Sequence, residues 1–595
     1  MDDGHNDQQK VEKKKALRFI LSYVKRHLTE VISGIILLMA VDLIQLFIPR
    51  IVQHTIDLLG EANFSYTIIT QNMIYIILLA FGMVIIRFFW RVLIVGTSRK
   101  IEKEVRHDMF AHLQTLSFSY FNRTKTGGLM ALMVNDVNAI RMATGPSFIA
   151  LTDAIFMGSL SLVFMFSIDL RISLFSILPL PIIILMMSRF GPMIQARFKA
   201  VQESFAAISS HTQESVSGIR VIKGYAQEKD AHSQFDSRCE DYVEKNIKLI
   251  KIWGFFFPSV TLLASLSLAI LYLLGGRSVI VRSLSFGEFI SLTMYINLLV
   301  WPVIAIGWVF NLLQRGVASA TRILELVETE PDVIESERVN GEIKEIRGSI
   351  TIRNLKFSYP ENNTPVLDGV NLSIESSSSL GIMGRPGSGK STLISLLFRL
   401  FPLNEGEISI DGYEIHQVPL RVLRGSIGYV PQDPFLFSDT IFNNITFGLG
   451  EDEVDQHEVE RVSKLTRIYE EIIGFSRGFD TVVGERGVTL SGGQIQRLSI
   501  ARALLLKPKI IVLDDALSQV DASKEKEILR SIFSEAHDTT IILASHRVST
   551  VRSCDNIVVL DEGRVIESGN HQKLMQKDGF YSRLFNLQRL EEEIV

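Results

Sequence analysis

The pentapeptide Leu490-Ser491-Gly492-Gly493-Gln494 decides how this chain is interpreted. It follows a glycine-rich segment, Gly384-Arg385-Pro386-Gly387-Ser388-Gly389-Lys390-Ser391, that fits the pattern G-x-x-x-x-G-K-S/T of a phosphate-binding loop. It precedes an apolar run that ends in an aspartate, Ile510–Asp514. A phosphate-binding loop alone indicates only that phosphates are bound. The three segments in this order are far more specific.

With these motifs the chain resembles the ATP-binding cassette (ABC) transporters, and the resemblance covers nearly all of it. The resemblance implies a membrane α-helical domain of six long transmembrane helices with cytoplasmic extensions. An α/β P-loop ATPase domain with a helical subdomain is expected to follow. The arrangement is similar to the exporter type of the family, in which the membrane domain and the cassette are fused.

The composition argues against a disordered protein and against a nucleic-acid-binding one. The chain has 595 residues, 47% of them hydrophobic, so it is too apolar for a disordered protein and too long for one domain. With 61 basic and 65 acidic residues its net charge is −4, which gives no reason to expect nucleic acid as a partner. Cys239 and Cys554 lie far apart and suggest neither a disulfide framework nor a metal-ligand cluster.

Six long apolar stretches precede residue 320, and each can cross a hydrocarbon core of roughly 30 Å as a helix. Buried helices of a soluble protein are the alternative, but these rarely stay apolar all round for so long. Basic residues from Lys10 to Arg26 place the N-terminus in the cytoplasm, and an even number of spans returns the chain there. The predicted spans are Val31–Pro49, Ile68–Val95, Ile140–Phe166, Leu170–Ile194, Trp253–Leu274 and Phe286–Leu312.

We therefore expect a multi-pass protein of the cytoplasmic membrane with both termini and the ATPase domain in the cytoplasm. Residues 1–30 form a cytoplasmic segment whose part Ala16–Leu28 predicts an amphipathic elbow helix on the inner membrane surface. Residues 31–328 form the transmembrane domain, 329–348 a charged linker and 349–595 the nucleotide-binding domain.

Two long polar segments between the spans have a helical pattern that suggests continuation of the membrane helices into the cytoplasm. In exporter-type ABC proteins, short transverse helices at the tips press on the ATPase domains. The matching stretches lie around Phe118–Thr126 and Gly218–Glu228. After Ser349, short apolar runs alternate with helical stretches, which indicates a mostly parallel sheet. These runs are Ile350–Ile352, Leu380–Met383, Ser426–Val430, Ile510–Leu513 and Thr540–Ala544.

The strand Leu380–Met383 and the helix Thr392–Phe401 give the glycine-rich loop the context that a phosphate site requires. Lys390 should reach the β- and γ-phosphates, and the Ser391 hydroxyl should bind Mg²⁺. ATP and Mg²⁺ are therefore the expected cofactors. The expected nucleotide-binding residues are Tyr359, Gly384, Arg385, Pro386, Gly387, Ser388, Gly389, Lys390, Ser391, Thr392, Gln432, Asp514 and His546.

Several of these residues take their roles from the resemblance. Tyr359 matches the adenine-stacking aromatic, with a core tyrosine as the competing interpretation. Asp514 matches the Walker B aspartate and, with Ser391 and Gln432, would hold Mg²⁺. Gln432 would also sense the attacking water, and His546 matches the histidine that contacts the γ-phosphate.

The segment Leu490–Gln494 begins a predicted helix that continues over Ile495–Leu505, and a helix N-terminus is a ready anion site. In ABC proteins this site serves the γ-phosphate bound by the other cassette. A single cassette then holds two half-sites and no complete one. The chain is expected to pair with a second ABC half-transporter chain.

Asp515 departs from the family pattern, which has glutamate, the general base, at this position. The shorter carboxylate matters because a base must lie within about 2.6–3.2 Å of its proton, and an error of about 1 Å costs roughly 10²-fold in rate. Asp515, His546 and Gln432 are the expected catalytic residues. The pattern resembles the degenerate-site subunit of a bacterial heterodimeric multidrug exporter. A homodimer that hydrolyses ATP slowly is the alternative.

Polar residues inside the spans suggest a substrate cavity, because charges at membrane depth are costly and usually functional or paired. The expected cavity residues are Asp42, Gln45, Asp153 and Asn297. Snorkelling to the inner interface would explain Arg87 and Arg91. Aromatic residues such as Tyr295 and Trp301 offer surface for a lipophilic ligand, although helix packing is the more common role.

Three functions compete on this fold. They are an ATP-driven exporter of drugs or other lipophilic compounds, a lipid flippase, and a nucleotide-gated channel or sensor. The third is disfavoured because the chain has no long regulatory insert around the cassette. The expected partners besides the second chain are a lipophilic small molecule and membrane lipid.

Overall fold

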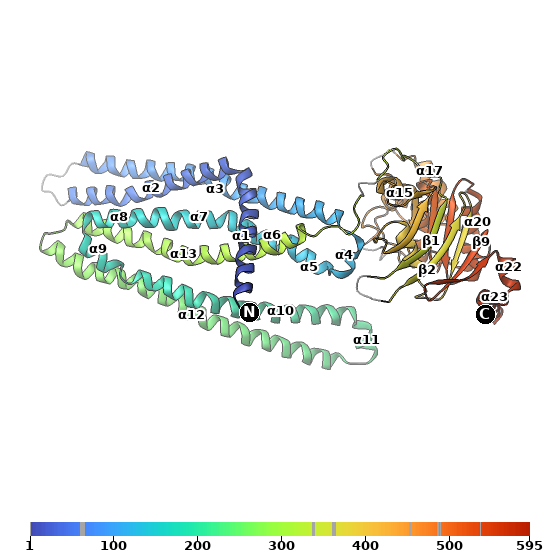
Figure 1. Ribbon diagram of the computed structural model, residues 1–595. Helices are drawn as coiled ribbons and strands as arrows, with labels where there is room; N and C mark the ends of the chain where they lie inside the picture. The colour runs from blue at the N-terminus through green and yellow to red at the C-terminus, as the bar shows by residue number, and fades with distance from the viewer. Residues whose placement is uncertain are drawn as a thin grey trace. The chain divides into compact units, whose positions relative to one another are not determined.

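The computed structural model describes residues 2–59, 66–335, 339–359, 364–450, 454–484, 487, 490–535 and 537–594. Two compact units make up the chain (Figure 1). Unit 1 consists of Met1–Thr115 and Thr124–Thr329. Unit 2 consists of Leu116–Arg123 and Glu330–Val595.

Unit 1 is helical, and within the described residues six of its helical stretches are long and apolar enough to cross a membrane. This confirms the six predicted spans. Each stretch is longer than its apolar core because the helix runs on into polar sequence. The stretches are α2 (Leu28–Leu59), α3 (Tyr66–Thr115), Thr126–Ile168, Leu170–Ser217, α12 (Glu228–Ile280) and α13 (Phe286–Val327).

The third and fourth stretches are built from shorter elements. Gly145 separates α6 from α7, and a Cβ there would lie 2.7 Å from Ser98 Cβ, so glycine allows α3 to approach closely. Asp169 caps α9 by accepting the Ile172 N–H at 2.8 Å, which fixes the turn between α8 and α9. The elements are α5 (Thr126–Ala131), η1 (Leu132–Asp136), α6 (Val137–Thr144), α7 (Pro146–Thr152), η2 (Asp153–Met157), α8 (Gly158–Ile168), α9 (Leu170–Ile177) and α10 (Leu180–Ser217). The short helix α11 (Ile219–Gly224) follows the fourth stretch.

Helix α13 is the centre of packing in unit 1, with α2, α6, α8, α10 and α12 against it. Figure 1 shows these helices side by side. Tyr295 on α13 is fully buried, and its hydroxyl donates to the Leu46 carbonyl at 2.9 Å. Tyr295 is thus a packing residue, which is the more common of the two roles considered for it.

The N-terminal helix is longer than the sequence predicts. Most of the predicted Ala16–Leu28 lies in α1 (Asp2–Arg26), whereas Leu28 begins α2, and α1 extends beyond Ala16 towards the N-terminus because residues 8–15 are mostly good helix formers. A hydrogen bond of 2.8 Å from the Tyr23 hydroxyl to Asp108 joins α1 to α3.

Unit 2 contains two sheets. The six-stranded sheet has the order β10-β9-β3-β8-β7-β6 and is parallel except for the β10–β9 pair, as predicted. The four-stranded sheet has the order β2-β1-β4-β5 and is antiparallel. The predicted strand Ile350–Ile352 belongs to this second sheet, because local alternation does not reveal strand direction.

The strands of unit 2 are β1 (Ile350–Phe357), β2 (Leu367–Ile374), β3 (Ser379–Met383), β4 (Glu405–Ile410), β5 (Tyr413–Glu414), β6 (Ile427–Val430), β7 (Ile510–Asp514), β8 (Thr540–Ser545), β9 (Asn556–Asp561) and β10 (Arg564–Gly569). Its helices are α4 (Phe118–Arg123), α14 (Lys390–Leu397), α15 (Leu420–Gly425), α16 (Ile441–Thr446), η3 (Phe447–Leu449), α17 (Gln456–Leu465), α18 (Tyr469–Ile473), η4 (Gly478–Asp480), α19 (Gly492–Leu505), α20 (Ala522–Glu535), α21 (Val548–Val551), α22 (His571–Gln576) and α23 (Phe580–Ile594).

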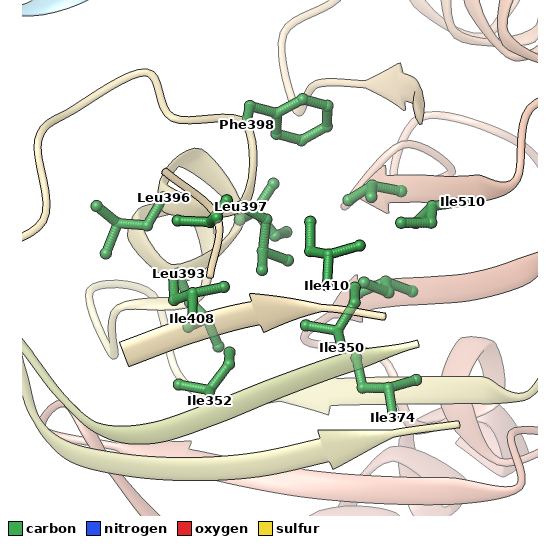
Figure 2. Close-up of a cluster of buried hydrophobic side chains, with 14 of the residues drawn as sticks. Ile350, Ile352, Ile374, Leu393, Leu396, Leu397, Phe398, Ile408, Ile410 and Ile510 are labelled. Carbon is green, nitrogen blue, oxygen red and sulfur yellow. The ribbon is translucent and has the colours of Figure 1, made fainter. Parts of the chain in front are cut away.

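The main core of unit 2 brings α14 together with both sheets. Leu393 and Leu397 of α14 lie in one cluster with Ile352 and Ile408 of the antiparallel sheet and Ile510 of the parallel sheet (Figure 2). Burying each such side chain contributes roughly 1.5–3 kcal/mol. This packing fixes the first turn of α14, where the phosphate-binding motif lies.

A second cluster belongs to α16–α19 and forms the predicted helical subdomain, with Val462, Ile472 and Leu498 at its centre. The short helix α4 also belongs to unit 2. Its Phe118 ring contacts Phe401 edge-on at 5.8 Å between centroids, and Ser119 hydrogen-bonds to Asp332.

Candidate functional site

The loop between β3 and α14 has a backbone that only glycine allows. Gly387 and Gly389 have φ of +81° and +101°. A Cβ on Gly384 would lie 2.2 Å from the Leu560 carbonyl oxygen, and one on Gly389 would lie 2.8 Å from Leu367. Ser388 is buried, and its Oγ has no hydrogen-bond partner within the described residues. The Ser388 hydroxyl is thus enclosed beside Gly384, and the backbone N–H groups of the loop are the expected donors to a phosphate chain.

Lys390 begins α14 and points back over this loop. Its Nζ donates to the Gly384 and Arg385 carbonyls at 2.8 and 3.0 Å. Burial lowers the pKa of Lys390, while the nearby Asp515 and Asp514 oppose the shift. A partly desolvated ammonium group interacts strongly with an anion, so this position suits a phosphate. Pro386 is exposed at the tip of the loop.

Asp514 and Ser391, two of the expected metal ligands, meet at the end of β7. Asp514 is 2% exposed, and burial raises the pKa of its carboxyl, whereas a hydrogen bond from Ser391 and the charge of Lys390 oppose the rise. Gln432, the third expected ligand, is exposed in the bend after β6, which pairs with β7. It lies at the same edge of the sheet, and a hydroxyl, a carboxylate and an amide oxygen suit Mg²⁺.

Tyr359 lies beside the first turn of α14. Its hydroxyl shares a hydrogen bond of 2.9 Å with Thr392. The Phe357 and Phe401 rings pack edge-on against it with centroids 5.1 and 5.3 Å away. The ring is half-buried and firmly placed. The Tyr359 ring can therefore both pack in the core and present one face beside the loop.

Asp515 and His546 are paired directly. His546 Nδ1 lies 2.8 and 3.1 Å from the two Asp515 carboxylate oxygens, and the Ser545 hydroxyl donates to one of them at 3.3 Å. The Asp515 side chain is 14% exposed and that of His546 45%. The backbone of Asp515 has φ +48° and its N–H donates to the Ala544 carbonyl. The carboxylate is held against β8.

The predicted signature segment opens α19 with a capping box. Ser491 Oγ accepts the Gln494 N–H at 3.3 Å, and Gln494 Oε1 accepts the Ser491 N–H at 2.8 Å. A Cβ on Gly493 would lie 2.7 Å from the Gln519 carbonyl oxygen, whereas one on Gly492 would meet the movable end of the Gln519 side chain. Leu490 packs against the helical subdomain. The exposed N-terminal end of α19 is therefore held in a fixed position.

Glu471 anchors this segment from α18. It accepts hydrogen bonds from Gln494 Nε2 at 2.9 Å, from Arg497 at 2.8 and 2.9 Å, and from Lys524 at 2.9 Å. Although burial opposes it, these bonds lower the pKa of Glu471 to about 2. Sequence reasoning did not identify Glu471. The Ser-x-x-Gln spacing of the capping box was readable in the sequence, but no local pattern points to a carboxylate on another helix.

A cavity of about 410 Å³ in unit 2 lies away from these motifs, between Arg461, Lys507 and His537. Its basic residues Arg461 and Lys507 already form ion pairs with Glu458. We therefore assign it no role in the chemistry.

In unit 1 the structure brings the four expected cavity residues together. A pocket of about 400 Å³ is lined by Asp42 and Gln45 of α2, Asp153 of η2 and Asn297 of α13. Arg87 and Arg91 of α3 also line it, and Arg87 donates to Gln45 at 3.0 Å. These arginines therefore have a protein environment besides the membrane interface proposed from the sequence.

Comparison with known proteins agrees with this geometry. Residues 31–303 match the model of the ABC transporter transmembrane region, and residues 367–518 match that of the ABC transporter domain. The multidrug resistance-like ATP-binding protein MdlA of Escherichia coli is 36% identical over 572 residues, which cover 96% of each chain. The chain belongs to the ABC transporter family.

Other relatives show the range of this family. A probable multidrug resistance ABC transporter ATP-binding/permease protein, YheI of Bacillus subtilis, is 36% identical over 94% of the chain and 95% of its own length. An ATP-dependent lipid A-core flippase of Syntrophus aciditrophicus is 31% identical over 85% and 84%. The structure of a bacterial Atm1-family ABC exporter with ATP bound has a TM-score of 0.76 at 26% identity, covering 95% of this chain and 99% of that one.

As an ABC exporter, the chain is a multi-pass membrane protein that binds ATP and couples its hydrolysis to transport. ABC exporters function as dimers. The function therefore requires two cassettes.

Proposed function

We propose that this chain is one half of a heterodimeric exporter that moves lipophilic or amphipathic compounds out of the cytoplasm across the cytoplasmic membrane. Its termini and unit 2 face the cytoplasm, where ATP is available. The proposal rests on the length of the Asp515 side chain and on its contacts. Its short carboxylate is bound by His546 and Ser545 rather than free to take a proton from water.

In this proposal the residues of the chain have separate tasks. Lys390 and the loop N–H groups bind phosphate oxygens, and Ser391, Asp514 and Gln432 hold Mg²⁺, which would neutralise phosphate charge. Tyr359 supports the adenine ring. Because the Asp515 carboxylate is short and held by His546, the site built on these residues turns over slowly. The partner chain supplies the faster site.

The faster site would use Ser491–Gln494 of this chain against the partner's P-loop. The rigid capping box and the Glu471 anchor support this role, because preorganised donors stabilise transition-state charge without reorganising. The multidrug-type relatives support a lipophilic substrate. A lipid flippase is the second candidate, supported by the relative that carries that name.

The test is transport by this chain purified together with its partner in sealed vesicles. ATP-dependent movement of a panel of lipophilic dyes, with slow or no movement of a fluorescent phospholipid, is the expected result. Movement of the phospholipid alone would replace the exporter proposal by the flippase. A complex that hydrolyses ATP and moves neither class would contradict both.

A further inference from the structure

The pocket around Asp42 contains a buried carboxyl group whose hydrogen-bonding capacity is not met. Asp42 is 4% exposed, and its Oδ2 has no hydrogen-bond partner within the described residues. A buried polar atom without a partner costs free energy that a native structure normally avoids. The pocket it lines has a volume of about 400 Å³, which is enough for a small organic group.

The neighbours of Asp42 favour a donor that carries positive charge. Asp153 lines the same pocket and accepts the Trp301 Nε1–H at 3.3 Å. Trp301 is 51% exposed, so much of its indole is accessible, and an indole face attracts cations. Two carboxyl groups and an indole therefore line one pocket on three different elements of unit 1.

The two arginines of the pocket do not cancel this preference. Arg87 donates to Gln45 at 3.0 Å, and the Arg91 guanidinium lies over the Trp90 ring at 5.6 Å. Arg87 acts electrostatically on both Asp42 and Asp153, but in the part of the chain that the structure describes it leaves Asp42 Oδ2 without a hydrogen bond. Both arginines are exposed, whereas Asp42 is not. Two buried polar atoms of this pocket have no hydrogen-bond partner within the described residues, the acceptor Asp42 Oδ2 and the donor Trp90 Nε1, and of these two the acceptor is the one that a cationic ligand satisfies.

We infer that this pocket binds a protonated ammonium group, with Asp42 Oδ2 accepting its N–H and Trp301 covering its charge. The inference rests on the proposed export function and narrows its substrate class to lipophilic amines. A primary or tertiary ammonium satisfies Asp42, whereas a quaternary ammonium has no N–H to donate. Two kinds of molecule carry such an ammonium group: a small lipophilic amine and the headgroup of phosphatidylethanolamine.

The test uses the full chain with its partner in nanodiscs of phosphatidylcholine. The probes are dansylcadaverine, a fluorescent lipophilic primary amine, and its N-acetyl derivative, which has the same ring and chain without the charge. Asp42→Asn should raise the Kd for dansylcadaverine by roughly tenfold or more and leave the Kd for the acetyl derivative unchanged. Asp153→Asn, whose amide oxygen still accepts from Trp301, should act in the same direction.

Asp169→Asn is the matched control, because it makes the same substitution at a helix cap outside the pocket and asparagine caps equally well. It should change neither Kd. Equal loss of both probes in Asp42→Asn and Asp153→Asn, or no loss of either, would overturn the inference. Nanodiscs with phosphatidylethanolamine assign the source. Weaker dansylcadaverine binding there indicates the lipid headgroup, and unchanged binding indicates the small amine.

Transport separates this inference from the exporter proposal. If the wild-type complex moves the N-acetyl probe but shows no charge-dependent binding at Asp42, the export proposal is supported and the ammonium-site inference is contradicted. If neither probe is moved but Asp42→Asn still weakens dansylcadaverine binding selectively, the site stands and the export proposal falls.

Discussion

At the scale of single residues, one methylene group separates Asp515 from the glutamate of the family pattern. The shorter side chain lies within hydrogen-bonding distance of His546 Nδ1 and near the Ser545 hydroxyl. Both contacts engage the carboxylate oxygens, and the side chain is one methylene group shorter than that of glutamate. Local chemistry thus agrees with a slow site on this chain.

The two ATP sites should therefore respond differently to mutation. In the complex with the partner, Asp515→Asn should change turnover less than about threefold, because that site already contributes little. Ser491→Ala should lower turnover by roughly 10²–10³, the effect of removing a donor to transition-state charge. Steady-state ATPase assays check both, with Ser531→Ala on α20 as a neutral control.

Ser491 also caps α19, so a second variant is needed to separate an effect on activity from an effect on stability. Ser491→Asp preserves the cap but places negative charge where a phosphate would bind. It should be as inactive as Ser491→Ala with an unchanged Tm. An active Ser491→Asp, or a complex inactivated by Asp515→Asn, would reverse the assignment of the two sites.

Glu471 gives a pH-dependent prediction. Its folded pKa of about 2 lies below its usual value of 4.5, so its ion pairs stabilise the fold above pH 4.5 and this contribution is lost as the pH falls towards 2. Glu471→Gln should cost about 1–2 kcal/mol at pH 7, since hydrogen bonds to charged groups are lost around the 5%-exposed Arg497.

Thermal unfolding of the wild type and Glu471→Gln from pH 7 to pH 3 measures this contribution. The difference in Tm should be constant above about pH 5 and shrink below pH 4.5. A difference that grows on acidification would contradict the ion-pair origin. Glu470→Gln, at the neighbouring position of α18, is the control.

At the scale of elements, unit 1 has a charged contact between η1 and α13. The Asp136 carboxylate is 8% exposed and accepts from Arg322 and from the Ser319 hydroxyl, the latter at 2.7 Å. The Arg322 side chain is half-exposed. The two partners therefore have unequal consequences when removed, because only one leaves a buried charge behind.

Arg322→Met should destabilise unit 1 by roughly 2–4 kcal/mol, since it leaves the Asp136 carboxylate buried with Ser319 alone. Asp136→Asn should cost about 1 kcal/mol or less, because the amide oxygen still accepts from both partners. Thermal unfolding in detergent, with the double variant completing the cycle, measures both effects. Equal costs for the two single variants would mean that the pair contributes no buried charge.

At the scale of the whole molecule, the proposed function gives one cassette the binding half of one ATP site and the signature half of another. The chain alone, reconstituted in lipid, should therefore show little ATPase activity. Addition of the natural partner, which should carry glutamate after its Walker B aspartate, should restore turnover. Robust basal hydrolysis by the single chain, comparable to that of a complete exporter, would contradict the heterodimer.

The sequence by itself determined the features that are contiguous. Six apolar runs specify six spans, because hydrocarbon thickness sets a length that each run meets. The phosphate loop and the signature helix were equally readable, since strand, loop and helix follow one another and the glycines are fixed by backbone geometry. The order of these motifs was sufficient for the family.

Only the tertiary structure decided which distant side chains meet. The sequence grouped Asp42 with Asp153 but did not place Arg87 or Trp301 beside them, because the four residues come from four elements and an error of one residue in a helix rotates a side chain by about 100°. The antiparallel partner strands of Ile350–Ile352 and the contact of Glu471 with Gln494 are likewise long-range. Such contacts depend on how helices and strands pack, which local periodicity does not encode.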